Sequence, residues 1–177
     1  MELKMKNTII FDLDGTLAII EKRRIKAGSP TGKTPTPSKM NWDVFFDAKN
    51  IKLDEPNIPV IKMAQTFHKD GFKIVIFSGR NDRSFHTTKE WLNQHGVPFD
   101  LLVMRPDKFK DESWPIASGN PATKAMRFMP DEILKKEMLN TFVNKDDVLM
   151  CVDDRQKVVD MWRENGLTCF QVAPGDF

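Results

Sequence analysis

Residues 9–16 read Ile-Ile-Phe-Asp-Leu-Asp-Gly-Thr, an apolar run followed by two carboxylates and a glycine. Side chains at positions i and i+2 of an extended backbone share a face, so Asp12 and Asp14 can both project beyond the carboxyl end of a strand. Ligands bind in that crevice in open α/β sheets. Asp before Gly is also ordinary turn chemistry, which accounts for Asp14 and Gly15 but not for a carboxylate placed directly against a buried strand.

Short apolar runs alternate with segments of helical spacing along the rest of the chain. Five strands are expected, at residues 8–11, 73–77, 101–104, 148–152 and 168–172. The clearest helices are expected at residues 59–68, 84–95, 131–143 and 155–165. Strands that alternate with helices pair in parallel through right-handed crossovers, so we expect a doubly wound α/β fold with a mainly parallel five-stranded sheet.

The overall composition fits one domain over residues 1–177, with 40% hydrophobic residues and a net charge of +2. This mild positive charge does not by itself argue for nucleic acid. Cys151 and Cys169 lie in apolar runs and no signal peptide precedes them, so we expect free thiols in a cytoplasmic protein. No apolar run approaches the ~20 residues of a membrane span, and no obligate protein partner is evident.

Two regions interrupt the alternation. Residues 21–60 are expected to form an insertion or small cap after the first strand, and its part from Glu21 to Lys39, rich in Pro, Gly, Ser, Thr and basic residues, has the composition of a mobile loop. In the same insertion, Trp42, Phe45 and Phe46 are expected either to pack as a small helix or to stack on a base. Residues 105–130 form a second long connection, of a kind that is often functional.

A second candidate site follows the run Ile74 to Phe77, where Ser78, Gly79 and Arg80 end the expected strand. A hydroxyl and exposed backbone N–H groups there can hold phosphate oxygens, and Arg80 can supply a bidentate fork. A plain strand-to-loop turn accounts for these residues equally well.

A third candidate site is the adjacent pair Asp153 and Asp154, again after an apolar run. Two neighbouring carboxylates repel each other unless a cation or a proton relieves the strain. Together with Asp12 and Asp14 they would place four acids in one crevice, which favours Mg²⁺ shared with a phosphate. The alternative is that one of the pair caps the next helix.

A fourth pair, Asp131 and Lys135, lies at spacing i, i+4 on an expected helix, so the two side chains share a face. A surface ion pair is the commoner meaning of this spacing, and Lys136 beside it adds a second candidate lysine.

These motifs, in this order on the strand ends of an α/β chain, resemble the haloacid dehalogenase (HAD) phosphatase superfamily. The carboxyl-terminal part is similar to the 3′-phosphatase domain of bacteriophage polynucleotide kinase, over residues 153–155, 158–159, 161–163, 171–173 and 175–177. The resemblance implies a nucleophile at Asp12, a general acid and base at Asp14, and Mg²⁺ held by Asp12, Asp14, Asp153 and Asp154. The phosphate and substrate contacts that it implies are Thr16, Arg23, Ser78, Gly79, Arg80, Asp131 and Lys135, with Asp131 orienting Lys135.

The resemblance predicts an enzyme, a Mg²⁺-dependent phosphomonoesterase that acts through an aspartyl-phosphate on the 3′-phosphate ends of polynucleotides. As an acid and base, Asp14 would need a pKa above its ordinary value of about 3.9. A nucleotidase that acts on free (deoxy)nucleoside monophosphates is the alternative, because basic residues attract phosphate in either setting. A phosphate-binding module without turnover is the further alternative.

Overall fold

Five parallel strands form the central sheet of the computed structural model, which describes residues 5–28, 40–107, 114 and 123–175. Their spatial order is β5 (Leu101–Arg105), β4 (Lys73–Asn81), β1 (Thr8–Phe11), β6 (Val148–Asp153) and β7 (Cys169–Gln171). β1 pairs with both β4 and β6 and therefore lies at the centre of the sheet. All five expected strands are confirmed, and β4 continues past Phe77 to Asn81.

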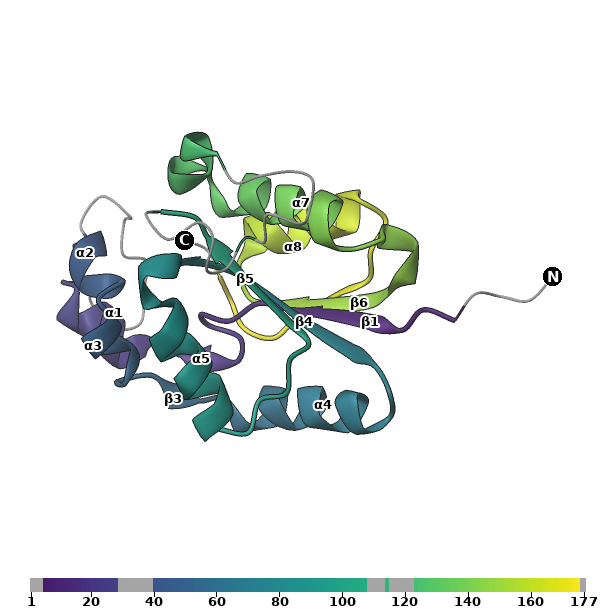
Figure 1. Ribbon diagram of the computed structural model, residues 1–177, viewed down its shortest axis with the longest axis horizontal. Helices are drawn as coiled ribbons and strands as arrows, with labels where there is room; N and C mark the ends of the chain where they lie inside the picture. Colours follow the sequence, from purple (N-terminus) through teal and green to yellow (C-terminus); the bar gives the residue numbers. More distant parts are fainter. Residues whose placement is uncertain (1–4, 29–39, 108–113, 115–122, 176–177) are drawn as a thin grey trace.

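Four helices cover the two faces of this sheet (Figure 1). One face carries α4 (Ile58–Lys69) and α5 (Phe85–Gln94), and the other carries α7 (Asp131–Phe142) and α8 (Gln156–Glu164). The alternation of side chains along β1 divides the core accordingly: Ile9 and Phe11 pack with α4 and α5, and Ile10 packs with α7 and α8. A strand buried on both faces is typical of parallel sheets, and the expected doubly wound α/β fold is confirmed.

The segment between β1 and α4 lies beside the carboxyl ends of the strands (Figure 1). It contains a two-stranded antiparallel pair, β2 (Ala18–Ile19) with β3 (Glu55–Pro56), and the helices α1 (Glu21–Lys26), α2 (Trp42–Phe45) and α3 (Ala48–Ile51). The prediction of a mobile loop from Glu21 onward is wrong for residues 21–26. An acid in the first turn and bases in the last complement the helix dipole, so these charges favour α1. Residues 29–39 lie outside the described part.

The remaining described elements are the 3-10 helices η2 (Asp82–Ser84), η4 (Lys124–Phe128) and η5 (Lys145–Asp147). η4 belongs to the long connection after β5, of which residues 108–113 and 115–122 are not described. Trp114, from the same connection, is buried with its ring 5.0 Å from that of Phe142. Cys151 and Cys169 are buried free thiols, as expected. Within the described ranges, no helix combines the length and apolar character needed to cross a membrane.

Candidate active site

Three buried carboxylates meet at the carboxyl ends of β1 and β6. Asp12 directly follows β1, Asp153 is the last residue of β6, and Asp154 follows it. The pairing of the two strands continues to this point, because the Asp12 backbone N–H donates to the Val152 carbonyl at 2.9 Å. One oxygen of each carboxylate lies within 4.8 Å of the other two. The register of the central sheet thus brings together acids that lie far apart in the sequence.

Lys135, a residue of α7, reaches into this acidic cluster. Its Nζ lies 2.6 Å from Asp12 Oδ1 and 3.0 Å from Asp153 Oδ2, and the side chain is buried. Burial lowers the pKa of Lys135, but the carboxylates of Asp12 and Asp153 outweigh this effect and raise the pKa above its usual range. Lys135 therefore carries a positive charge inside the cluster, and the reading of it as half of a surface ion pair is wrong.

The Asp131 carboxylate pairs with two arginines rather than with Lys135. It accepts from Arg105 at 2.5 Å and from Arg155 at 2.6 Å. Burial raises the pKa of Asp131, but these guanidinium groups outweigh it and lower the pKa. Asp131 thus joins two arginines at the edge of the site, and the expected direct pairing that orients Lys135 is not what the structure shows.

The three carboxylates of the cluster differ in how many donors they engage. Asp153 accepts from Lys135, from Trp162 Nε1 at 3.1 Å and from the Asp154 backbone N–H at 2.9 Å. Asp12 accepts from Lys135 and from Thr16 Oγ1 at 2.9 Å. The Asp154 carboxylate has a long contact of 3.4 Å from the Thr16 hydroxyl. Among the described residues, Asp154 is therefore the acid of this cluster with the most unused acceptor capacity.

The charge balance of the cluster favours a cation. Burial raises the pKa of Asp12 well above its usual range, and repulsion from Asp153 adds to the rise while Lys135 opposes it. Burial likewise raises the pKa of Asp154 to about 6, again with a contribution from Asp153. Lys135 alone does not neutralise three acids, and carboxylate oxygens are the ligands that Mg²⁺ prefers. The donor set therefore fits a hard divalent cation, with Asp12 and Asp154 as the acids best placed to hold it.

Gly15 leaves the space that the Asp154 carboxylate fills. A Cβ atom at position 15 would lie 2.2 Å from Asp154 Oδ2, and the backbone there has a φ of +86°. Gly79 does the same for Asp131, because a Cβ would lie 2.5 Å from its Oδ1. Gly15 and Gly79 thus each allow a carboxylate to approach the backbone closely.

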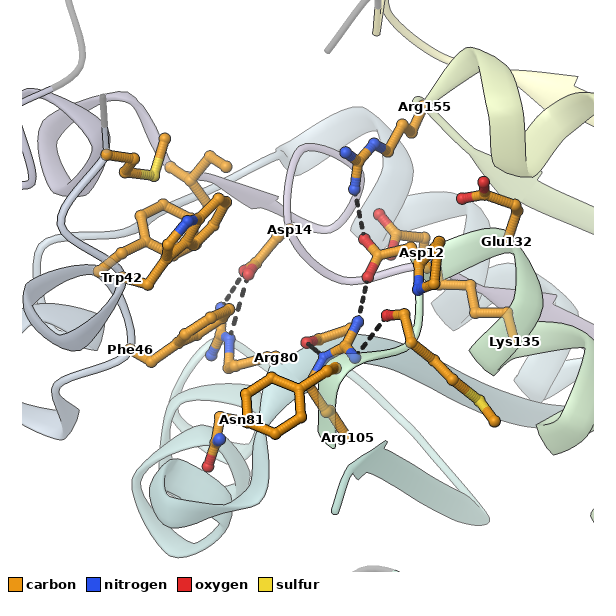
Figure 2. A pocket seen from close by; sticks show the side chains of 18 of the residues that line it. Asp12, Asp14, Trp42, Phe46, Arg80, Asn81, Arg105, Glu132, Lys135 and Arg155 are labelled. Atoms are coloured by element: carbon orange, nitrogen blue, oxygen red, sulfur yellow. Dashed lines mark hydrogen bonds and ion pairs between the residues drawn. The ribbon is translucent and has the colours of Figure 1, made fainter. Parts of the chain in front are cut away.

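Asp14 points away from the acidic cluster. Its carboxylate pairs with Arg23 Nη2 at 2.6 Å. It also pairs with Arg80, as Figure 2 shows. Burial raises the pKa of Asp14, but the two guanidinium groups outweigh it and lower the pKa to about 2. The predicted raised pKa is therefore wrong for this conformation. The Asp14 carboxylate is also absent from the acidic cluster, although it was expected among the metal ligands.

Arg23 and Arg80 are both fully buried, and both also bind Asp54. Arg23 Nε lies 2.9 Å from Asp54 Oδ1, and Arg80 Nη2 lies 3.0 Å from Asp54 Oδ2. Burial raises the pKa of Asp54 to about 6, with both arginines opposing the rise. Arg23 was expected to contact substrate from a loop, but the structure places it inside this ion-pair network. Asp54 was missed because it follows no strand and lies in a polar segment.

The remaining predicted contacts lie around this network. Ser78 is fully buried and its hydroxyl accepts a hydrogen bond from the Arg80 backbone N–H at 3.1 Å. Gly79 and Arg80 line the pocket above the acids. Thr16 is buried and its hydroxyl contacts Asp12. Neither Ser78 nor Thr16 is among the described residues that line the pocket.

A cavity of about 630 Å³ opens above Asp12, Asp153 and Asp154. Its wall combines basic and aromatic side chains. Besides the lysine and arginines described above, its basic residues are Arg24, Arg83, Arg127 and Lys157. Its aromatic residues are Trp42, Phe45, Phe46 and Phe128. Of these, sequence reasoning considered the three aromatics at 42–46 and Arg24 in the basic segment. It missed Phe128 and Arg127, because an arginine and a phenylalanine in a long connection carry no recognisable spacing.

Comparisons with known proteins agree with this geometry. Residues 34–177 match the family model described as the polynucleotide kinase PNKP phosphatase domain. A solved structure of a Pnkp1/Rnl/Hen1 complex contains a chain that is 28% identical, with a TM-score of 0.70 over 99% of this chain and 49% of that one. A second such structure, of the Pnkp1/Rnl/Hen1 RNA repair complex, is 29% identical with a TM-score of 0.68 over 97% of this chain and 44% of that one. The chain thus spans about half the length of these two matched chains.

More distant structures share the fold alone. A predicted phosphatase from Clostridium acetobutylicum is 16% identical, with a TM-score of 0.63 over 95% of this chain and 85% of that one. A phosphoserine phosphatase, solved as a phospho-aspartyl intermediate analogue, is 20% identical with a TM-score of 0.55 over 93% of this chain and 86% of that one.

Proposed function

Because the chain belongs to the polynucleotide kinase PNKP phosphatase domain family and is a HAD-type phosphatase, we propose that it removes phosphate from the 3′ ends of polynucleotides. The reaction would pass through an aspartyl-phosphate at Asp12 and depend on Mg²⁺. The observation that carries the proposal is the Lys135 ammonium group between Asp12 and Asp153, at the floor of a pocket whose wall carries several arginines.

Asp12 is the proposed nucleophile. Lys135 contacts one of its oxygens and Thr16 the other, so the carboxylate is held in a fixed orientation toward the cavity. In the first step an Asp12 oxygen bonds to phosphorus, and the bond between phosphorus and the 3′ oxygen breaks. The leaving oxygen takes the electron pair of that bond. The Lys135 charge would stabilise the phosphoryl oxygens as they gather negative charge, which is the main source of catalysis in phosphoryl transfer.

Asp14 is the proposed acid and base, although it is ionised in the conformation observed. To donate a proton it must leave Arg23 and Arg80, take up a proton from solvent as its pKa rises away from the two guanidinium groups, and approach the leaving oxygen. The incoming phosphate can favour this change, because it competes with Asp14 for the Arg80 guanidinium at the pocket wall. After proton transfer, the ionised Asp14 would accept a proton from the water that hydrolyses the aspartyl-phosphate.

Mg²⁺ is the proposed cofactor, with Asp12 and Asp154 as the carboxylates that would hold it. When bound it would offset the negative charge of the acids and of the phosphate. Asp153 would serve mainly to hold Lys135, because its oxygens already accept hydrogen bonds from Lys135, from Trp162 and from the backbone N–H groups of residues 154 and 155.

A polynucleotide end is the proposed substrate because the pocket offers more cations than one phosphate needs. Arg83 and Arg127 lie 3.2 and 2.5 Å from the Asp107 carboxylate at the rim, and Arg83 also lies 3.5 Å from the exposed Asp43. Lys157 on α8 is exposed and lines the same pocket. These residues can attract the phosphodiesters that precede the 3′ end.

The test compares phosphate release from a 3′-phosphorylated oligonucleotide, a 3′-mononucleotide and a 5′-mononucleotide, each with Mg²⁺ and with EDTA. We expect the oligonucleotide to have the highest kcat/KM, a preference that weakens as salt is raised, and no turnover in EDTA. Equal or better hydrolysis of free mononucleotides would make the protein a nucleotidase instead. Full activity in EDTA would refute the metal dependence.

Two variants test the chemical roles. Asp12→Asn should lower kcat at least about 1,000-fold while the protein still unfolds cooperatively, whereas Asp146→Asn, an exposed acid of η5, should match the wild type. Asp14→Asn should lower kcat more on a 3′-phosphorylated sugar than on p-nitrophenyl phosphate. The sugar 3′ oxygen is a poor leaving group that needs a proton, whereas the nitrophenolate leaves without protonation. Equal losses on both substrates would remove the acid role from Asp14.

A further inference from the structure

Two aromatic side chains stand exposed in the wall of the catalytic pocket. Within the described ranges the exposed aromatic residues are Trp42, Phe128 and Phe170, with 43%, 81% and 52% of their surface accessible. Trp42 and Phe128 line the pocket, whereas Phe170 lies on the edge strand β7. Exposed aromatic rings are costly in water, so their presence beside the reacting acids asks for a ligand with an apolar face.

The first of these rings belongs to an ordered platform. The ring of Trp42 stacks on that of Phe46 at 5.7 Å and 21°, and both contact Phe45, which is buried. The Arg23 guanidinium lies over the Phe45 ring at 4.2 Å and also donates to the Phe45 carbonyl at 3.1 Å. The platform is thus fixed to the same arginine that holds Asp14.

The second ring, Phe128, comes from η4, whose backbone is pinned by Arg105. Nη1 of Arg105 donates to the carbonyls of Met126 and Met129 at 3.0 and 2.7 Å. The Arg127 guanidinium lies 5.3 Å from the centre of the Phe128 ring. An exposed ring next to a cation, on a backbone held in place, suits a ligand that combines a flat apolar group with a phosphate.

We propose that Trp42 and Phe128 are stacking residues for the terminal base or bases of the oligonucleotide, and so determine specificity for a nucleoside-bearing end. This inference rests on the proposed function. The Trp42 and Phe46 platform would hold one base on the α2 side of the pocket, and Phe128 would contact a base from the η4 side. Arg127 would neutralise the phosphodiester between the bases. Any base presents a π-face, so this recognition is tolerant of sequence.

The kinetic test compares two oligonucleotides with the same 3′-phosphate, one with its normal terminal base and one with an abasic terminal sugar. We expect the wild type to favour the normal end roughly tenfold in kcat/KM. Trp42→Ala and Phe128→Ala should each bring this ratio closer to one, and Trp42→Phe should largely restore it. Phe170→Ala, an exposed aromatic outside the pocket, is the matched control and should keep the wild-type ratio. A wild-type ratio of one, or a ratio that neither Ala variant changes, would overturn the inference.

A binding test is independent of turnover. The other three tryptophans, at positions 91, 114 and 162, are buried, so in Asp12→Asn protein the quenching of tryptophan fluorescence by an oligonucleotide should report mainly on Trp42. Quenching should disappear when Trp42→Phe is added, and should be weaker with the abasic oligonucleotide. If no phosphate is released from any oligonucleotide yet base-dependent quenching persists, the proposed function fails and the stacking site stands. If phosphate is released from the oligonucleotides but the terminal base makes no difference to kcat/KM, the proposed function stands and the stacking site fails.

Discussion

Lys135 Nζ lies 2.6 Å from Asp12 Oδ1, although 123 positions of the chain separate the two residues. The same Nζ lies 3.0 Å from Asp153, so one ammonium group joins the ends of two neighbouring strands. This contact connects the fold to the chemistry, because α7 delivers the only lysine within hydrogen-bond distance of the acidic cluster among the described residues.

Removal of this lysine should affect both stability and rate. Lys135→Ala leaves two buried carboxylates without their cation, and breaking a buried ion pair costs about 3 to 5 kcal/mol. The same change should lower kcat about 100-fold or more, because a charge aimed at the phosphoryl group is lost. Urea unfolding in EDTA and phosphate release measure the two effects. Lys136→Ala, at the exposed neighbouring position, is the control. If Lys136→Ala lowered kcat more than Lys135→Ala does, the wrong lysine would have been assigned.

The adjacent acids Asp153 and Asp154 should respond differently to the same substitution. Asp154→Asn should weaken Mg²⁺ binding about tenfold or more with little change in metal-free stability, because its carboxylate engages few donors. Asp153→Asn should destabilise the metal-free protein, since its oxygens hold Lys135 and Trp162. Thermal unfolding with increasing Mg²⁺ separates the two effects. A metal-dependent rise in Tm that survives Asp154→Asn unchanged would move the metal site elsewhere.

Gly15 and Gly71 allow backbone strain to be separated from crowding. Both have positive φ, +86° and +91°, but a Cβ at position 15 meets Asp154 whereas one at position 71 meets nothing within 4 Å. Gly71→Ala should cost roughly 1 to 2 kcal/mol with normal activity. Gly15→Ala should cost about 3 kcal/mol or more and raise the Mg²⁺ concentration needed for activity. If the two variants behaved alike, the Asp154 carboxylate would not depend on the space at Gly15.

The free energy of unfolding should depend on pH through the ionisation of Asp14. Its pKa in the folded protein, about 2, lies below the ordinary value of 3.8, so the ionised form is stabilised by folding. The contribution, about 2 kcal/mol, is present above pH ~3.8 and is lost as the pH falls through about 2. Because the pKa of Asp54 is about 6 and depends on Asp14, the two proteins are compared below that range: the difference in unfolding free energy between wild type and Asp14→Asn, in metal-free buffer, should shrink as the pH falls from about 4 to about 2. A difference that grows on acidification would indicate a raised pKa.

The central sheet could be predicted from the sequence because its strands are buried on both faces. Residues 8–11, for example, are apolar apart from Thr8, and this composition is specific enough to locate β1. The placement of Asp12, Asp153 and Asp154 followed from the same rule, since the carboxyl ends of parallel strands meet at one edge. The short helices α1 and α3 were not located, because four to six residues carry too little periodicity to be distinguished from a loop. A small helix at Trp42, Phe45 and Phe46 was one of the two expectations for that segment and is present as α2.

The electrostatic state of Asp14 could not be obtained from the sequence. It depends on contacts with Arg23 and Arg80, which come from two distant segments, and on Asp54, which shares both arginines. A basic residue such as Arg23 in a polar, proline-rich segment looks exposed in the sequence. Its burial follows only from the packing of α1 against α2 and the Phe45 ring.

Arg105 fixes the backbone of the η4 segment without depending on the side chains that this segment presents to the pocket. Its guanidinium binds backbone carbonyls of the η4 segment and of Gly79 rather than the side chains of that segment. The path of the chain through residues 126–129 is therefore largely independent of which side chains stand at positions 127 and 128. Substitutions at positions 127 and 128 should therefore alter what binds against the pocket wall while the contacts among Asp12, Lys135 and Asp153 stay as they are.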